Sequence, residues 1–256
     1  MLQSLNPRRL SASGPLRIFP LSPWWGRQTI AGVSGPERRI LGVIFDMDGV
    51  LCDSEPFICE AACRMFAETY HLQVRQEDFL PFVGAGEDRY IGGVAEKYGV
   101  RLDVEKDKAR TYEIYLRIIR GRLGPLAGVH DFLGACRKRG LRLAVATSAD
   151  RIKMEGNLAQ INLPPERFDA CITGSDIERK KPHPDIFLRA AERLGLPPSH
   201  CLVVEDAPNG VQAAKAAGSP CLALTSSFSE DQLRSAGADW VATDLAHVPG
   251  GVFGGL

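Results

Sequence analysis

GVIFDMDGVLCDS, residues 42–54, joins an unbroken apolar run to two carboxylates that stand one residue apart. An apolar run without alternation is typical of a strand buried on both faces, as in a parallel sheet. Asp46 and Asp48 follow this run directly, with Gly49 next and Asp53 a few residues further on. Negative charges held this close repel one another unless a positive group lies between them. The stretch therefore predicts a buried strand that ends at a cation site.

Similar short apolar runs recur along the chain and alternate with helical patterns. Ile186, Ala190 and Leu194 share one face of a helix predicted at 184–195, and a second helix is predicted at 209–218. Strands and helices in alternation predict an α/β fold, a doubly wound parallel sheet with helices on both faces and right-handed crossovers. The predicted strands are 39–45, 141–148, 168–174, 200–206, 220–226 and, as a short edge strand, 238–243.

One interval breaks this alternation. About a hundred residues separate the first two predicted strands, whereas a βαβ unit takes roughly 30. The surplus is too long for a loop and carries helical patterns, so we expect an inserted helical cap domain at 55–121. An insert at this point lies above the carboxyl edge of the sheet, where open α/β folds bind ligands. The core domain is then formed by 39–54 and 122–256, and the helices of the cap are predicted at 55–70, 87–99 and 103–121.

The N-terminal 36 residues differ in composition from the rest of the chain. They contain arginine and serine but no Asp or Glu, and no periodicity persists in them. This composition resembles that of an organelle transit peptide. Their proline content and the lack of a sustained amphipathic helix favour a disordered tail or a misassigned start instead, for example initiation at Val33. We assign 1–38 to such a tail and expect a cytoplasmic protein, or an organelle protein if the segment is a transit peptide.

The composition gives no support to a nucleic-acid-binding function or to a membrane-bound one. Formal net charge is zero, so nothing in the charge balance favours nucleic acid or an acidic membrane as a partner. No apolar run reaches the roughly 20 residues of a membrane span. Seven scattered cysteines contain no CxxC pair and are expected to be buried, reduced thiols. We therefore expect no nucleic acid partner and no membrane partner, and we predict a monomer.

Polar side chains gather where the predicted strands end. Taken singly, such residues are explained as helix caps, turn formers or solvated surface groups. Their occurrence together, in order along the chain, favours one shared site at the carboxyl edge of the sheet. They are Asp46 and Asp48 after the first strand, Thr147 and Ser148 after the second, Lys180 and Lys181 after the third, and Glu205 and Asp206 after the fourth.

These residue types suit phosphate chemistry. Carboxylates from the first and fourth strands can converge on Mg²⁺, which prefers one or two carboxylates, waters and a phosphate oxygen. A lysine and a hydroxyl facing them can hold the remaining oxygens of a phosphate. An aspartate can also act as a nucleophile toward a phosphoryl group, and a metal and a lysine stabilise the charge of an in-line transition state. The positive group between Asp46 and Asp48 is therefore predicted to be Mg²⁺.

Four segments resemble the ordered motifs of the haloacid dehalogenase (HAD) superfamily, and among its members the β-phosphoglucomutase-like phosphatases with a helical cap are the most similar. The resemblance runs from about Arg39 to Asp244 and implies a HAD Rossmann-like core and turnover of phosphate esters. The four segments are DMDGVLCDS (46–54), ATS (146–148), KKPHPD (180–185) and VVEDAPNG (203–210).

The resemblance also implies roles for single residues. Asp46 is the nucleophile, and Asp48 is first general acid and then general base. Thr147, with Ser148 beside it, binds the phosphate, and Lys181, which immediately precedes the proline, bridges phosphate and nucleophile. The implied magnesium site consists of Asp46, the backbone carbonyl of Asp48, Asp206 and the supporting Glu205.

Two departures from the resembled mutases favour a phosphatase. Those mutases carry a histidine at the position of Ile58 and an arginine near Gly86, and this sequence has neither. The segment FVGAGEDRY (82–90) is predicted to reach into the site and select the leaving group through Gly86, Glu87 and Arg89, with a plain interhelical turn as the alternative.

The sequence therefore predicts a Mg²⁺-dependent phosphomonoester hydrolase that acts on small phosphorylated metabolites, sugar phosphates foremost, through an aspartyl-phosphate intermediate. A β-phosphoglucomutase-type mutase is the alternative. A catalytically inactive HAD-fold binding protein is disfavoured because every motif residue is present.

Overall fold

A computed structural model describes residues 39–84 and 86–253, and in it six strands form one parallel sheet in the order β3-β2-β1-β4-β5-β6. This confirms the predicted α/β fold, with 238–243 supplying the edge strand. β1 lies between β2 and β4, so the strand that precedes Asp46 is enclosed on both sides. The predictions for residues 1–38 lie outside the described residues. The strands are β1 (Gly42–Phe45), β2 (Arg142–Ala146), β3 (Ala170–Ile172), β4 (Cys201–Glu205), β5 (Cys221–Leu224) and β6 (Trp240–Ala242).

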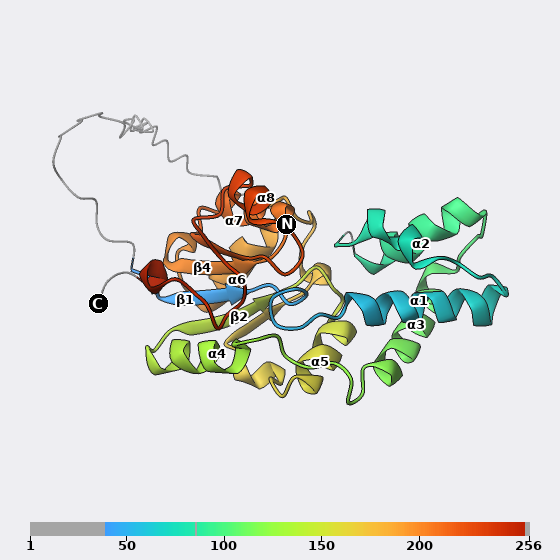
Figure 1. Cartoon of the computed structure of the whole chain (residues 1–256), viewed down its shortest axis with the longest axis horizontal. Helices are drawn as coiled ribbons and strands as arrows, with labels where there is room; N and C mark the ends of the chain where they lie inside the picture. Colours follow the sequence, from blue (N-terminus) through green and yellow to red (C-terminus); the bar gives the residue numbers. More distant parts are fainter. Residues whose placement is uncertain (1–38, 85, 254–256) are drawn as a thin grey trace, which may run out of the picture. The chain divides into compact units, whose positions relative to one another are not determined.

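Helices cover both faces of the sheet (Figure 1). Neighbouring strand residues point to opposite faces, so Phe45 packs against one helical layer and Ile44 against the other. Phe45 meets Phe132 edge to face, with 6.0 Å between ring centroids. Both layers bury apolar side chains, which is why β1 has no polar face. The first layer holds α4 (Val129–Lys138) and α5 (Arg151–Gln160), and the second holds α6 (Asp185–Leu194), α7 (Pro208–Ala216) and α8 (Glu230–Ser235).

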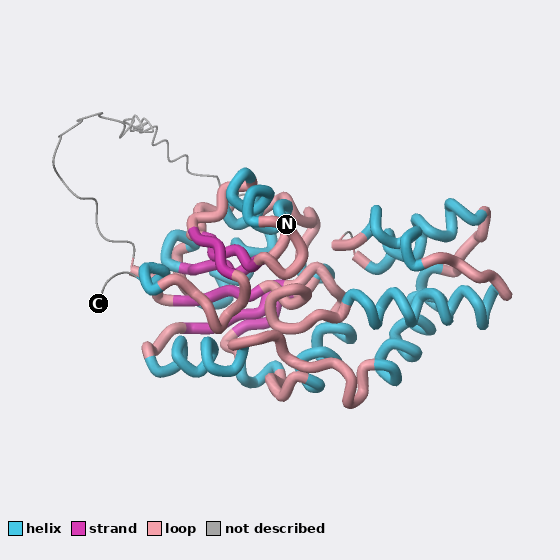
Figure 2. Tube along the Cα trace, viewed as in Figure 1, coloured by secondary structure: helices cyan, strands magenta, loops and turns pink. Residues whose placement is uncertain are grey.

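Between β1 and β2 the described residues form helices and loops without a strand (Figure 2). We refer to residues 55–118 as the helical insert. Its first helix spans the predicted residues 55–70, whereas its last helix ends at Ile118 instead of Gly121 because Gly121 adopts a φ of 66° and the chain turns there. The elements of the insert are α1 (Glu55–Tyr70), the 3₁₀ helix Gln76–Phe82, α2 (Glu87–Tyr98) and α3 (Val104–Ile118).

The insert and the sheet share one hydrophobic cluster. Phe45 and Met47 of the sheet region belong to the same buried cluster as Phe66 of α1 and Tyr115 of α3. The Tyr115 hydroxyl also donates to Oδ1 of Asn157 on α5, and both side chains are buried. Continuous apolar burial, reinforced by this hydrogen bond, holds the insert against the core.

A buried carboxylate joins the 3₁₀ helix of the insert to the end of α2. The Asp78 side chain is only 2% exposed and accepts hydrogen bonds from Lys97 Nζ and Tyr98 Oη, each at 2.5 Å. Its other partner is Arg75, whose backbone N–H donates at 3.3 Å and whose guanidinium donates at 3.2 Å. These bonds tie the 3₁₀ helix to the end of α2.

All seven cysteines are free thiols, as predicted, but the burial that was also predicted for them holds for only four. Four of them are fully buried, and the other three are half-buried. The buried cysteines are Cys52, Cys136, Cys201 and Cys221.

Within the described part of the chain, no helix combines the length and the apolar character needed to cross a bilayer.

Candidate active site

The carboxyl ends of the central strands bring the predicted motif residues to one cavity. The backbone N–H of Asp46 donates to the Val204 carbonyl at 2.9 Å, and that of Thr147 donates to the Ile172 carbonyl at 3.0 Å. These bonds extend the sheet pairing one residue beyond β1 and β2, so both side chains start from fixed positions. The cavity measures about 440 Å³, and its lining includes Asp46, Asp48, Thr147, Ser148, Lys181, Glu205 and Asp206.

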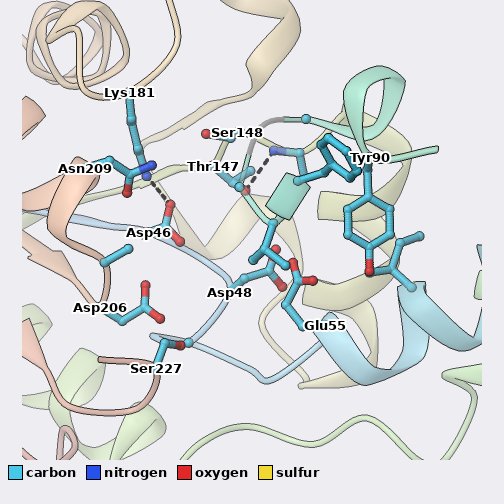
Figure 3. Close-up of a pocket in the computed structure, with 18 of the residues that line it drawn as sticks. Asp46, Asp48, Glu55, Tyr90, Thr147, Ser148, Lys181, Asp206, Asn209 and Ser227 are labelled. Atoms are coloured by element: carbon cyan, nitrogen blue, oxygen red, sulfur yellow. Dashed lines mark hydrogen bonds and ion pairs between the residues drawn. The ribbon is translucent and has the colours of Figure 1, made fainter. Parts of the chain in front are cut away.

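Lys181 is the cation beside the predicted nucleophile. Its Nζ contacts Oδ1 of Asp46 and lies 2.6 Å from Oε1 of Glu205, and its side chain is 6% exposed. Burial alone would lower the pKa of Lys181, but the two carboxylates outweigh this and raise the pKa above its ordinary value. The amine is therefore charged. Figure 3 shows it pointing at Asp46 from the opposite wall of the cavity.

Glu205 holds Lys181, and both of its carboxylate oxygens accept hydrogen bonds. Oε1 faces the lysine, while Oε2 accepts from the backbone N–H groups of Asp206 at 3.0 Å and Ala207 at 3.1 Å. A methyl group at Gly210 would lie 1.9 Å from Oε1, so the start of α7 packs directly on this carboxylate. This geometry suits the supporting place that the resemblance implies for Glu205, which acts on the site through Lys181.

Asp46 and Asp206 form a carboxylate pair that fits a divalent cation. Each is 7% exposed, and Asp206 takes part in no ion pair among the described residues. Burial raises the pKa of Asp46 to about 7, with Lys181 opposing and Glu205 adding to the shift. Burial, Glu205 and Asp46 likewise raise the pKa of Asp206 well above its ordinary value. Two buried carboxylates that resist ionisation together are suited to bind a cation between them.

The loop after β1 is shaped around this pair. Gly49 has a φ of 72°, and a methyl group there would lie 1.9 Å from Oδ2 of Asp206, so only glycine allows this approach. No three His, Cys, Asp or Glu side chains of residues 39–84 and 86–253 are grouped to hold a metal ion. A cation here would therefore take two carboxylates and complete its shell with backbone oxygen, water or phosphate, as Mg²⁺ does.

Asp48 points away from this pair and toward a buried lysine. Its Oδ1 accepts from the Ser54 hydroxyl, and its Oδ2 lies 3.0 Å from Nζ of Lys153. A contribution of Asp48 to a metal would thus come from its backbone carbonyl. Lys153 is 2% exposed and also lies 3.7 Å from Oε1 of Glu87. It joins the sheet edge to the insert.

The insert lines the far side of the cavity with acidic and aromatic groups. Gly86 and Glu87 border the cavity as predicted, together with Glu55 and Tyr90. Glu87 is 8% exposed, and its Oε2 has no hydrogen-bond partner among the described residues. Burial raises the pKa of Glu87 and brings that of Glu55 to about 7, with Lys153 opposing both shifts.

Arg89 lies elsewhere. Its guanidinium donates to the Glu96 carboxylate at 2.8 and 2.9 Å and lies 4.9 Å from the ring centroid of Phe82. It is exposed and is not among the residues that line the cavity. Glu87 and Arg89 are two residue steps apart on α2, and two steps turn the side chain by about 200°, so the two side chains cannot face the same cavity. The geometry does not support the predicted contact of Arg89 with a substrate.

Several lining residues escaped the sequence reasoning. Lys153 reads as a surface lysine in the sequence, although Asn157 and the apolar Met154 and Leu158 share its helix face. A lysine on an apolar face was the signal that could have identified it. For the others the sequence offers no comparable signal. They are Glu55, Tyr90, Asn209 and Ser227.

The fold and the site define an α/β enzyme of the hydrolase type. Residues 40–218 match the family of haloacid dehalogenase-like hydrolases, and the chain belongs to that family. This confirms the resemblance seen in the four motifs.

Three similar proteins add detail. The chain is 42% identical over 250 residues to protein SUPPRESSOR OF QUENCHING 1, chloroplastic, of Arabidopsis thaliana, a match that covers 96% of this chain but 22% of that protein. It is 34% identical over 176 residues to a phosphorylated carbohydrates phosphatase of Thermotoga maritima, covering 69% of this chain and 81% of that protein. CbbY from Rhodobacter sphaeroides, solved in complex with phosphate, aligns with a TM-score of 0.71 at 25% identity over 81% of this chain and 95% of CbbY. The family and these relatives confirm an enzyme of the phosphatase type.

Proposed function

We propose that this protein hydrolyses small phosphomonoesters, sugar phosphates foremost, with Mg²⁺ as cofactor and an aspartyl-phosphate on Asp46 as intermediate. The observation that carries the proposal is the contact of Lys181 with Asp46 in a cavity that Asp206 and Thr147 also line. The relative that acts on phosphorylated carbohydrates supports the substrate class. The two buried carboxylates support the metal.

In the first half-reaction an Asp46 oxygen attacks phosphorus, the bond from phosphorus to the leaving oxygen breaks, and Asp48 protonates that oxygen. In the second, Asp48 takes a proton from water as the water oxygen attacks phosphorus, and Asp46 leaves as a carboxylate. Lys181, Thr147 and Ser148 hold phosphate oxygens. Asp46, Asp206 and the carbonyl of Asp48 would hold Mg²⁺, which would supply positive charge that offsets the repulsion between phosphate and carboxylates.

Release of inorganic phosphate from p-nitrophenyl phosphate tests this proposal. We expect turnover with Mg²⁺, none in excess chelator, and none in Asp46→Asn, while the exposed Asp131→Asn on α4 retains full activity. Rapid quenching should leave one phosphoryl group on the peptide that contains Asp46. Undiminished turnover in chelator would exclude the metal, and turnover by Asp46→Asn would exclude the nucleophile.

The mutase alternative differs in what attacks the aspartyl-phosphate: a second hydroxyl of a bound sugar phosphate instead of water. Ile58 lines the cavity with an apolar, 2% exposed side chain, which supports water as the acceptor because it offers no cation to a second phosphate. Incubation with β-glucose 1-phosphate and a glucose bisphosphate primer distinguishes a phosphatase from a mutase. We expect phosphate release to exceed formation of glucose 6-phosphate, and the reverse would establish a mutase.

The location and assembly of the protein are also proposals. The relative named as chloroplastic supports the organelle alternative over the cytoplasm, since its match covers 96% of this chain and so includes most of residues 1–38. A fluorescent fusion to the C-terminus reports the location.

We propose a monomer that needs only its small phosphorylated substrate as partner, and light scattering during gel filtration tests this.

A further inference from the structure

Two of the seven cysteines lie one helical turn apart on the insert. Cys59 and Cys63 are both on α1, beside its buried face, and both are half-buried. Residues four apart on a helix are neighbours on its surface. The two thiols face the same stretch of chain: Sγ of Cys59 lies 3.9 Å from the Gln76 carbonyl, and Sγ of Cys63 lies 3.9 Å from the Val74 carbonyl. A thiol is a weak donor, so neither contact commits its sulfur to one partner.

The surroundings of this pair make its two thiols unequal. The Cys63 thiol and the Tyr90 hydroxyl both donate to the sulfur of Cys59, and these bonds lower the pKa of Cys59 although burial and the charges of Glu55 and Glu77 oppose them. The same arrangement raises the pKa of Cys63, which therefore stays a thiol. Because the thiolate is the nucleophilic form of cysteine, Cys59 is the more reactive member of the pair.

The other five cysteines lack such an environment. Four of them are fully buried, and burial raises the pKa of each. Cys171 is half-buried like Cys59, but burial raises its pKa to about 11. Cys59 is thus the one cysteine of the seven that combines access from solvent with a pKa below the ordinary value.

Cys59 is also connected to the cavity. Tyr90, whose hydroxyl donates to it, is 5% exposed, and its side chain lines the cavity (Figure 3). Ile58, the preceding residue, lines the cavity as well. Gln76 begins the 3₁₀ helix that ends at Phe82, a further lining residue. A group attached to the sulfur of Cys59 would occupy the space beside Gln76 and change the partner of the Tyr90 hydroxyl, so its effect would reach the cavity wall.

We propose that Cys59 is a site of reversible modification by low-molecular-weight disulfides, and that this modification lowers the activity of the adjacent cavity. The Cys59 thiolate attacks one sulfur of a disulfide such as glutathione disulfide, and the bond between the two glutathione sulfurs breaks as the mixed disulfide forms. The second glutathione leaves as a thiolate and takes a proton from water. Cys59 is oxidised in this exchange, and the departing glutathione is reduced.

Helix geometry determines the product. Cβ atoms four residues apart on a helix are about 5–6 Å from each other, whereas a disulfide requires about 3.5–4.5 Å. Cys63 therefore cannot displace the glutathione by forming a disulfide with Cys59 while α1 stays helical. The mixed disulfide persists until an external thiol attacks it.

Mass spectrometry of the full chain treated with glutathione disulfide tests the site. We expect one added glutathione, which fragmentation of the modified peptide locates at Cys59, and no addition in Cys59→Ser. Cys63→Ala should slow the addition about threefold because Cys59 loses a hydrogen-bond donor, whereas Cys171→Ala, the matched change at another half-buried thiol, should not. Addition at a different cysteine, or a disulfide that joins Cys59 to Cys63, would overturn the proposal.

The effect on turnover rests on the proposed phosphatase function and is measured separately. Modified wild-type protein should release phosphate from p-nitrophenyl phosphate at least about threefold more slowly, and dithiothreitol should restore the rate. Cys59→Ser treated in the same way should keep its full rate. Undiminished turnover by fully modified protein would overturn the link to the cavity. If the untreated wild type releases no phosphate, the proposed function is wrong, while the labelling experiment still decides whether Cys59 is the modified site.

Discussion

Lys153 is a buried charge that balances carboxylates from two parts of the chain. It is 2% exposed, and it contacts Asp48 of the sheet edge and Glu87 of the insert. Burial would lower the pKa of Lys153, but Asp48, Glu87 and Glu55 raise it well above its ordinary value, so the amine stays charged. Removing one partner of such a group leaves buried charge uncompensated, which costs about 3–5 kcal/mol.

We therefore expect Lys153→Met to lower the melting temperature by roughly 10 °C and to reduce kcat, because Asp48 loses the partner that holds it. Differential scanning calorimetry and phosphate release measure the two effects. Lys138→Met on the exposed side of α4 is the matched control and should change neither. Adding Glu87→Gln to Lys153→Met should recover part of the lost stability. A melting temperature equal to that of the wild type would show that Lys153 is not required for charge balance.

Single residues of the site differ in how far the sequence predicts them. Asp46 and Thr147 are identified by position, since each directly follows a strand whose end the apolar run marks. Lys181 lies nine residues beyond the end of β3 at Ile172, and its role was predicted from the resemblance of KKPHPD to a family motif. Lys153 was missed because the mixed pattern of α5 obscures the apolar face on which Lys153 lies, and its burial depends on the packing of α5 against α3. Arg89 shows the converse: its type suits substrate binding, but helix geometry turns it toward Glu96.

At the scale of elements, the start of α7 is set against Glu205 by Gly210. The backbone of α7 approaches the carboxylate so closely that a methyl group would lie 1.9 Å from Oε1. Gly210→Ala should displace Glu205 and with it Lys181, lowering kcat on the order of 100-fold. Gly134→Ala in α4, where a methyl group meets no atom within 4 Å, should be neutral or stabilise by about 0.5–1 kcal/mol. Wild-type kcat in Gly210→Ala would show that Lys181 is positioned without Glu205.

The Asp78 network predicts a pH-dependent contribution to stability. Lys97, Tyr98 and Arg75 hold the pKa of Asp78 well below its ordinary value, so its stabilisation is complete above about pH 5 and is lost as pH falls through the folded-state pKa. Asp78→Asn should lower the melting temperature by on the order of 5 °C at pH 7, and the difference should shrink between about pH 5 and 2. Circular dichroism melting curves measure this difference in melting temperature, and the exposed Glu105→Gln is the control. A difference that is constant with pH would contradict the ionic origin.

Elements with regular patterns were predicted well, and those with mixed patterns were not. The apolar strand runs and the helix at 55–70 were predicted because burial and periodicity agree there. α4, α5 and α8 were not assigned residue ranges; α5 contains Lys153, Gly156 and Asn157 among its apolar positions, which obscures its periodicity. Tertiary packing, not local propensity, forms it.

For the whole molecule, the buried carboxylates link folding to pH and to metal. Burial raises the pKa of Asp46 and Glu55 to about 7, so without metal the folded state binds more protons than the unfolded chain. Stability in chelator should therefore fall as pH rises from about 4 to 7. A cation needs ionised Asp46 and Asp206, so stabilisation by Mg²⁺ should be several degrees at pH 7.5 and near zero at pH 4.5. Melting curves with and without Mg²⁺ test this; Asp206→Asn should abolish the Mg²⁺ effect, and an equal effect at both pH values would contradict it.

The central place of β1 has a consequence for synthesis. β1 leaves the ribosome before the other strands of the sheet, yet its neighbours β2 and β4 begin only at Arg142 and Cys201. At about 5–20 residues per second, both neighbours are available only after roughly 8–30 s. During that time the insert can form its local helical contacts, while GVIF waits as an unpaired apolar edge that is prone to aggregation. The strand that carries the nucleophile is thus the one that waits longest for its partners and most needs protection during translation.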